Sequence, residues 1–286
     1  TTLFRSGEPL RPDQLWNPDA VLRVEDIHHR PDTKDRLDKA AVWPTNGRAR
    51  FGIEPTGRYG RIDGVRDAYI DVETKAIAEI LRKHPQVWVF ADEIYGQLVY
   101  DGEFHSIAAL PGMQERTIIS DGCSKTWAMT GWRLGFAANK KLAPFFTNWI
   151  TNTESCASHI TQWAGVEALN GPQDDARYMR EVFLSRRNLI VGLLNQVPGV
   201  TCKSPGGAFY AWPNVTEACR LTGCADSEVL RKRLLLEAGV AVLADIHVGP
   251  RVPGDGQHIR FSYAASDEAI KAGIARMADF IQKNTV

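Results

Sequence analysis

Residues Ser124–Phe136 read SKTWAMTGWRLGF and place a primary amine and a guanidinium eight positions apart, at Lys125 and Arg133. The runs on either side, Glu115–Ser120 and Trp132–Ala138, are predicted to be extended. A lysine among apolar neighbours is readily desolvated, which eases the loss of its proton, and the neutral amine attacks carbonyl carbons. The stretch therefore predicts a carbonyl-reactive lysine and an anion-binding arginine at one edge of a sheet.

A second stretch, Ala91–Gly96, reads ADEIYG and continues the apolar run Val87–Ala91. Continuous apolar runs of this length are typical of strands buried on both faces. Asp92 then stands at the carboxyl end of a strand, where open α/β sheets bind their ligands. Together, the two stretches predict Schiff-base chemistry on an anionic cofactor.

These motifs resemble those of the fold-type I pyridoxal 5′-phosphate enzymes, in the aspartate-aminotransferase-like branch of the class I and II aminotransferases. The family's DExY motif matches Asp92 and Tyr95, which implies contacts to the pyridine nitrogen and to the ring hydroxyl. The family's SKxxAMTGWRLG motif matches Lys125 as the Schiff-base lysine and Arg133 as the phosphate ligand. The resemblance extends almost unbroken from Val72 to the end of the chain, and three motifs in the right order make a chance match very unlikely.

Ser124 is implied as a further cofactor-binding residue, next to the lysine. The family often carries its phosphate hydroxyl three residues before the lysine, where this chain has Gly122. Ordinary packing is the alternative role for Ser124 and also for Tyr95.

A late motif, His258–Ala264, reads HIRFSYA and resembles the family's xxRxSYA strand. In that strand the arginine, here Arg260, holds the α-carboxylate of the substrate through a two-pronged guanidinium contact. A structural carboxylate within the protein is the alternative partner, because a buried guanidinium needs an anion.

Two matches near the N-terminus are weaker. The segment Phe4–Pro9 resembles GxGEP, which implies that Gly7 lets the backbone approach the substrate carboxylate. An ordinary turn is an equally good interpretation. Tyr59 resembles the tyrosine of a shortened YxxxxGxxxLR segment, which reaches the cofactor phosphate of a neighbouring subunit. Alternatively, Glu54–Gly57 is a degraded NPTG motif, and the family's order of motifs does not allow both.

Many tens of residues of the family's large domain have no counterpart between these segments and Val72. Among them are the turn and helix N-terminus that cradle the phosphate, and the aromatic ring that stacks on the pyridine. We therefore expect part of the N-terminal large domain to be missing.

The expected fold class is α/β: a fold-type I large domain with a mostly parallel sheet, and a smaller α+β C-terminal domain. The expected domains are an N-terminal segment at 1–50, an incomplete cofactor-binding large domain at 51–171 and a small domain at 172–286. Helices are predicted in the region that begins at Asp71, in two pieces within Asn139–Asn170, and in three of the elements that follow. The second-domain predictions are helices Asp174–Gln196, Ser227–Ala238 and Asp267–Lys283 and strands Val200–Lys203, Ala208–Pro213, Val240–Leu243 and Ile259–Tyr263.

The long helix Asp174–Gln196 is expected to turn an apolar stripe towards the core and its arginines towards solvent. The expected core residues are Val182, Leu189, Leu193 and Leu194; the arginines expected outside are Arg180, Arg186 and Arg187. Ser266 is expected to cap the N-terminus of the last helix.

Composition limits the classes of partner. The 286 residues carry 34 Lys and Arg against 34 Asp and Glu, so no overall field favours nucleic acid or a membrane surface. The five cysteines form no CxxC pair, which favours a reducing compartment, and we expect a cytoplasmic protein. The pair His28–His29 is a poor metal site, since adjacent side chains diverge, and no metal is expected.

The resemblance implies an aminotransferase that moves an amino group between an L-amino acid, aspartate or a similar one, and a 2-oxo acid such as 2-oxoglutarate. It also implies a homodimer. Two alternatives stay open: a lyase that uses the same cofactor at the same carbon, and a non-catalytic binding module that keeps the fold. The missing phosphate cradle favours the binding module, whereas the presence of Asp92, Tyr95, Lys125, Arg133 and Arg260 favours the aminotransferase.

Overall fold

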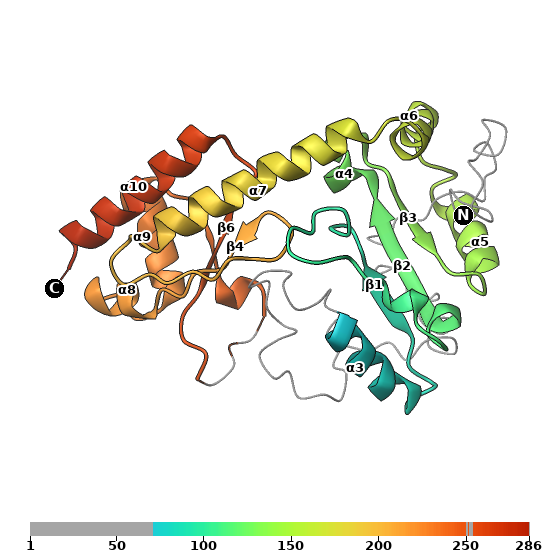
Figure 1. Cartoon of the computed structure of the whole chain (residues 1–286), viewed down its shortest axis with the longest axis horizontal. Helices are drawn as coiled ribbons and strands as arrows, with labels where there is room; N and C mark the ends of the chain where they lie inside the picture. The colour runs from blue at the N-terminus through green and yellow to red at the C-terminus, as the bar shows by residue number, and fades with distance from the viewer. Residues whose placement is uncertain (1–70, 250, 252–253, 286) are drawn as a thin grey trace. The chain divides into compact units, whose positions relative to one another are not determined.

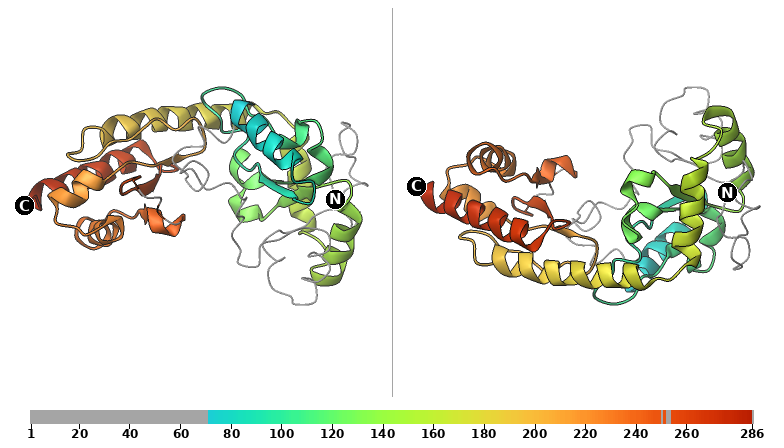
Figure 2. Two further views of the ribbon diagram at one scale, coloured as in Figure 1. Left: turned by 90° about the horizontal axis from the view of Figure 1, so that it is seen from below. Right: turned by 90° about the horizontal axis from the view of Figure 1, so that it is seen from above.

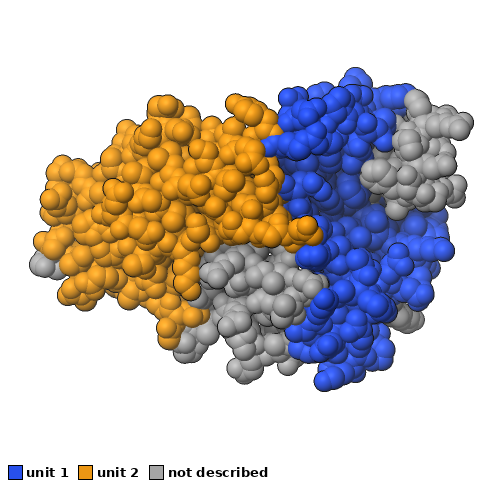
Figure 3. Space-filling model, viewed as in Figure 1, with its two compact units in different colours: residues 1–50, 69–97, 104–177 blue, residues 51–68, 98–103, 178–286 orange. Residues whose placement is uncertain are grey.

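The computed structural model describes residues 71–249, 251 and 254–285. Within these residues the chain forms two compact units (Figure 3). Unit 1 comprises residues 71–97 and 104–177, and unit 2 comprises residues 98–103 and 178–285. The predicted domain limits, at 50 and 171, stay a prediction.

Unit 1 is built on a three-stranded mixed sheet in the order β1-β2-β3 (Figure 1). Strand β1 (Val89–Asp92) runs parallel to β2 (Thr117–Gly122), and β2 runs antiparallel to β3 (Gly135–Ala138). Asp92 lies opposite Ser120, so β2 extends two residues beyond β1 at their common carboxyl edge. The sheet and its helices confirm the α/β class.

Strand β1 is shorter and less buried than the sequence predicts. Val87 donates its backbone N–H to the His84 carbonyl at 3.0 Å, which keeps it in the turn after the preceding helix. Val89 is buried, but the next residue, Phe90, is 36% exposed. The expectation of a strand buried on both faces over Val87–Ala91 is therefore wrong within the described part of the chain.

The helices of unit 1 pack on the sheet through three apolar clusters. Helix α3 (Asp71–Arg82) packs Ala78 and Leu81 against Val89. Helix α5 (Ala143–Thr153) packs against β3, and helix α6 (His159–Asn170) packs against the segment that joins β2 to β3. The prediction of two helical pieces before residue 171 is confirmed.

Unit 2 combines an antiparallel sheet with four helices, as an α+β unit should. The sheet order is β4-β6-β5, with β4 at Tyr210–Ala211, β5 at Leu243–Ala244 and β6 at Ile259–Ser262. The helices are α7 (Asp174–Leu194), of which residues from 178 on belong to this unit, α8 (Thr216–Leu221), α9 (Ser227–Ala238) and α10 (Asp267–Lys283). Helices α9 and α10 lie side by side (Figures 1 and 2) and are joined by Arg233, whose guanidinium lies 4.9 Å from the Phe280 ring centroid.

One strand prediction for unit 2 fails for a physical reason. The strand expected at Val200–Lys203 forms only the single bridge Thr201 to Asn214. The backbone N–H and C=O of Cys202 bond to the side-chain amide of Asn195, at 2.8 and 2.9 Å, so they are not available for a strand partner. Helix α8 was not predicted.

The buried stripe of α7 is rotated from the predicted one. Its buried residues are Phe183, Arg187, Ile190 and Leu194. Arg187, predicted to face solvent, is only 8% exposed. Its Nη1 donates to Asp101 Oδ2 at 2.7 Å and to the Pro205 carbonyl at 3.1 Å, which compensates the buried charge.

The cap of the last helix is as predicted. Ser266 Oγ accepts the backbone N–H of Ala269 at 3.2 Å, and Asp267 and Glu268 occupy the first turn of α10. Such a cap satisfies one of the four N–H groups that a helix start leaves without a partner.

Candidate active site

The carboxyl end of β1 presents Asp92 and Tyr95. Asp92 is exposed, and its Oδ1 accepts the backbone N–H of Ile94 at 3.3 Å. A tight turn follows, closed by the Gly96 N–H on the Glu93 carbonyl at 2.8 Å, and this turn carries Tyr95. The local sequence therefore bends immediately after the strand and keeps both side chains at the sheet edge.

Lys125 reaches the same edge from the neighbouring strand. The short helix α4 (Cys123–Thr126) begins directly after β2, so Lys125 lies one turn beyond the carboxyl end of that strand. Its Nζ lies 5.9 Å from the centroid of the Tyr95 ring. Since β1 and β2 are parallel neighbours, the structure brings Asp92, Tyr95 and Lys125 together.

Gly122, the residue before this helix, is required by a close approach of two backbones. A Cβ on Gly122 would lie 2.8 Å from the Leu134 carbonyl oxygen and 3.0 Å from the Gly135 Cα. Position 122 therefore has no room for a serine hydroxyl, and the half-buried Ser124 is the nearest hydroxyl residue before Lys125.

Arg133 lies at the end of a short 3₁₀ helix, Thr130–Trp132, in the left-handed region with φ 53°. Ala128 has the same φ, so two non-glycine residues between α4 and β3 are in a strained conformation. Strain of this kind is frequent at ligand-binding sites. Arg133 is exposed, and its one hydrogen bond in the described part of the chain goes to the Thr130 carbonyl, at 3.0 Å, so no described carboxylate neutralises it.

Two further carboxyls near this edge were not predicted. Burial raises the pKa of Asp121, on β2, to about 6, with the charges of Glu93 and Asp92 adding to the effect. Burial also raises the pKa of Glu93, although a hydrogen bond from Ser106 opposes the shift. The signal in the sequence was a single acidic residue in an otherwise uncharged strand, in the run ISDG. The site therefore combines the Lys125 amine with two carboxyl groups, Glu93 and Asp121, whose pKa is raised.

Arg260 lies in unit 2, in the middle of β6. It is half-buried, and its guanidinium carbon lies 4.5 Å from the centroid of the Tyr210 ring. Among the described residues it forms no ion pair and no hydrogen bond with a carboxylate. The alternative of a structural carboxylate partner thus finds no support in the part of the chain that the structure describes.

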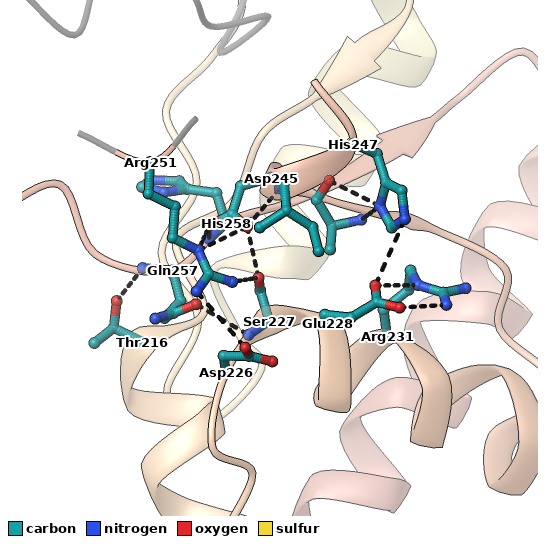
Figure 4. A network of polar contacts seen from close by, with 12 residues as sticks. Thr216, Asp226, Ser227, Glu228, Arg231, Asp245, His247, Arg251, Gln257 and His258 are labelled. Atoms are coloured by element: carbon teal, nitrogen blue, oxygen red, sulfur yellow. Dashed lines mark hydrogen bonds and ion pairs between the residues drawn. The ribbon is translucent and has the colours of Figure 1, made fainter. Parts of the chain in front are cut away.

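The start of β6 is anchored by a polar network around Asp245 (Figure 4). Asp245 accepts the Ser227 hydroxyl at 2.7 Å, the Arg251 guanidinium at 3.1 Å and the His258 backbone N–H at 3.2 Å. Because His258 is two residues before Arg260, the network fixes the strand on which Arg260 is carried.

The remaining predicted positions, Gly7 and Tyr59, lie outside the described residues, as does the alternative motif at Glu54. In the described ranges, no group of three or more His, Cys, Asp or Glu side chains is arranged to hold a metal ion. Of the helices in those ranges, none has the length and apolar character needed to cross a membrane.

Comparison with known proteins identifies the family. Residues 70–277 match the model of the family described as aminotransferase class I and II. A putative aminotransferase of Bacillus subtilis, YugH, is 44% identical over 218 residues, which are 76% of this chain and 54% of that protein. The aspartate aminotransferase of Geobacillus stearothermophilus is 38% identical over 221 residues, covering 75% of this chain and 54% of that protein.

Solved structures agree. The aspartate aminotransferase of Rhizobium meliloti superimposes with a TM-score of 0.70 at 33% identity, covering 76% of this chain and 55% of that one. The chain therefore belongs to the class I and II aminotransferases and has the fold-type I architecture of that family. It spans about half the length of the curated relatives that it matches.

Proposed function

We propose that the protein is a pyridoxal 5′-phosphate-dependent aminotransferase, acting between an L-amino acid and a 2-oxo acid such as 2-oxoglutarate. The observation that carries the proposal is the position of Lys125, with its Nζ beside the Tyr95 ring at the sheet edge that also presents Asp92. Membership of the aminotransferase family supports the same conclusion.

The residues present suit this cofactor chemically. Lys125 offers an amine for the aldehyde, Asp92 a carboxylate for the ring nitrogen and Tyr95 a phenol for the ring oxygen. Arg133 offers a cation for the phosphate, and no described carboxylate competes for it. When bound, the cofactor supplies an electron sink for the bond electrons released at the substrate α-carbon.

The chain's own residues then position charge and move protons. Asp92 would keep a proton on the ring nitrogen, because a nearby carboxylate favours the charged form of its partner. Lys125 would take the proton from the substrate α-carbon and return it, as a general base and then acid. Arg260 would orient the substrate by its α-carboxylate, for which the planar guanidinium fork is suited.

The experiment is the reduction of the protein with borohydride after addition of pyridoxal 5′-phosphate. A visible absorption band should form, and reduction should fix the cofactor on Lys125, as located by peptide mapping. Lys125→Ala should abolish the label and lower the rate of amino transfer at least about 10²-fold. Lys141→Ala is the matched control, since this exposed lysine pairs with Glu115 on the surface. A label on another lysine would contradict the assignment.

The proposal includes the preferred substrate, the oligomeric state and the cellular compartment. The preferred amino acid is aspartate or a similar one, and a panel of half-reactions in which an aromatic or aliphatic amino acid reacts far faster would refute this. The protein is a homodimer, which an active monomer in sedimentation would refute. Its compartment is the cytoplasm, which fractionation of cells can test.

A further inference from the structure

The environment of Arg260 contains an aromatic ring where a carboxylate would be the usual partner. Tyr210 pairs with Ser262 across the antiparallel β4–β6 ladder, and Arg260 is two residues before Ser262. Residues two apart on a strand share one face, so Tyr210 and Arg260 are diagonal neighbours, within reach of an aromatic and a long side chain. The 4.5 Å from guanidinium carbon to ring centroid is within the range of a cation–π contact.

The same diagonal occurs once more along this ladder. The bridge between Asn214 and His258 continues the register, and the Trp212 ring stacks on the His258 ring at 5.7 Å with an interplanar angle of 9°. In both cases an aromatic side chain lies against a side chain of the opposite strand that is two positions before its own cross-strand partner. Tyr210 lies against Arg260 in this way, and Trp212 lies against His258. The face of the sheet that carries Arg260 therefore has two such aromatic side chains, Tyr210 and Trp212.

Tyr210 is itself held by its neighbours. Its ring lies 4.8 Å from the Phe209 ring centroid, and Phe209 packs on Phe183 at 5.3 Å. The backbone just before it is fixed at Ala208, whose carbonyl accepts the hydroxyls of Tyr100 and Tyr263. Ala208 has φ 56°, a strained conformation that such bonds hold in place.

We propose that Tyr210 is the positioning residue of the carboxylate site and acts by holding the guanidinium of Arg260 against its ring. A carboxylate partner would also hold the guanidinium, but it would neutralise the charge and occupy the N–H donors. The face of an aromatic ring attracts the cation and leaves its charge and its in-plane donors for the α-carboxylate of an amino acid or 2-oxo acid. This inference rests on the role proposed above for Arg260.

The test compares three substitutions in the protein loaded with pyridoxal 5′-phosphate, with binding of 2-oxoglutarate measured by calorimetry. Tyr210→Phe keeps the ring and should bind within about 3-fold of the unaltered protein. Tyr210→Leu keeps bulk but removes the ring and should weaken binding about 3- to 30-fold. Arg260→Leu should weaken it further. Tyr178→Leu is the matched control, because this tyrosine of the same unit is 71% exposed.

A spectroscopic readout separates positioning from a general structural effect. In protein labelled with ¹⁵N-arginine, the side-chain Nε–H signal of Arg260, assigned by its loss in Arg260→Leu, should be displaced by the ring current of Tyr210. Tyr210→Phe should keep that displacement, and Tyr210→Leu should remove it. Other arginine signals should stay in place in all variants.

The outcomes distinguish the two proposals. If Arg260→Leu binds 2-oxoglutarate like the unaltered protein, Arg260 is not the carboxylate site and the proposed function loses that residue. If Arg260→Leu loses binding but Tyr210→Leu does not, the positioning role is wrong while the proposed function stands. Equal losses in Tyr210→Phe and Tyr210→Leu would assign the effect to the hydroxyl and also overturn the inference.

Discussion

The described arginines differ in whether a carboxylate lies near enough to neutralise the guanidinium. Arg187 has a carboxylate and a carbonyl as partners, as a buried structural arginine requires. Arg133 and Arg260 make no ion pair with any carboxylate in the described ranges, although Arg260 is half-buried and Arg133 has strained backbone. An uncompensated guanidinium is stabilised when an anionic ligand binds, which is why these two are the candidate anion sites.

The raised pKa of Asp121 predicts how the stability of the protein changes with pH. Its pKa is about 6 in the folded protein, against an ordinary 3.8, so the folded state binds the proton more tightly than the unfolded chain does. Stability associated with this group is complete below about pH 4 and is lost as pH rises through about 6. Asp121→Asn should therefore become progressively more stable than the unaltered protein between pH 4 and 7, by up to about 3 kcal/mol.

Urea unfolding at several pH values measures this difference. Glu79→Gln is the control, since Glu79 is exposed on α3 of the same unit, and its effect should not vary in the same way. A constant difference between Asp121→Asn and the unaltered protein over this pH range would contradict the assigned cause.

Two glycines with ordinary backbone angles, Gly122 and Gly192, give opposite predictions for stability when each is replaced by alanine. A Cβ at Gly122 meets backbone atoms of Leu134 and Gly135, at 2.8 and 3.0 Å, where the β2–β3 pair begins. Gly122→Ala must push these backbones apart and should lower the free energy of unfolding by about 1–3 kcal/mol. A Cβ at Gly192, in α7, meets nothing within 4 Å, so Gly192→Ala should raise it by about 0.5–1 kcal/mol.

Denaturant unfolding of both variants tests why position 122 is a glycine. The reason is either the close approach of the β2 and β3 backbones or only the flexibility that glycine gives the chain. If flexibility were the reason, both substitutions would have the same sign. Loss of the visible cofactor band in Gly122→Ala, without loss in Gly192→Ala, would further connect the strand pair to the site.

The sequence predicted elements best where local signals suffice. The cap at Ser266 and the extent of α10 follow from residues adjacent in the chain, and so does the pair Asp92 and Lys125 at the ends of neighbouring strands. The sequence-based predictions failed where the burial of a residue depends on a partner far away in the chain. The buried stripe of α7 was predicted wrongly because apolar residues occur in adjacent runs, Val182–Leu184 and Leu189–Val191, which allow more than one stripe. Arg187 is buried where Asp101 and Pro205 accept its hydrogen bonds. The strained Arg133 and the Tyr210 platform depend equally on tertiary packing.

The assignment of residues to the two compact units does not follow their order in the chain. Residues 98–103 lie between two parts of unit 1 in the sequence but belong to unit 2. Their backbone bonds to the 206–208 turn, with Tyr100 N–H on the Gly206 carbonyl at 2.7 Å and Ala208 N–H on the Leu98 carbonyl at 2.8 Å. Arg180 adds a bond to the Val99 carbonyl at 2.7 Å. The same turn leads into Tyr210, so this segment supports the strand beside Arg260.

Arg187 bonds both to Asp101 of the 98–103 segment and to Pro205, next to the 206–208 turn, so its removal should destabilise the contact between segment and turn. Arg187→Ala breaks the pair with Asp101 and the bond to Pro205, and leaves the Tyr100 ring without the cation 5.3 Å from its centroid. The charge left behind is Asp101, whose side chain is 60% exposed, so the main loss is that of hydrogen bonds to a charged group, and we expect about 1.5–3 kcal/mol in urea unfolding. Arg220→Ala, at an ion pair whose arginine is 71% exposed, should cost less than about 1 kcal/mol. In hydrogen exchange, Arg187→Ala should lower the protection of the Tyr100 and Ala208 amides. The hydrogen bonds of these two amides join the 98–103 segment to the 206–208 turn, and Arg187 holds that segment in place. Unchanged protection of those two amides in Arg187→Ala would mean that the segment is anchored without the arginine.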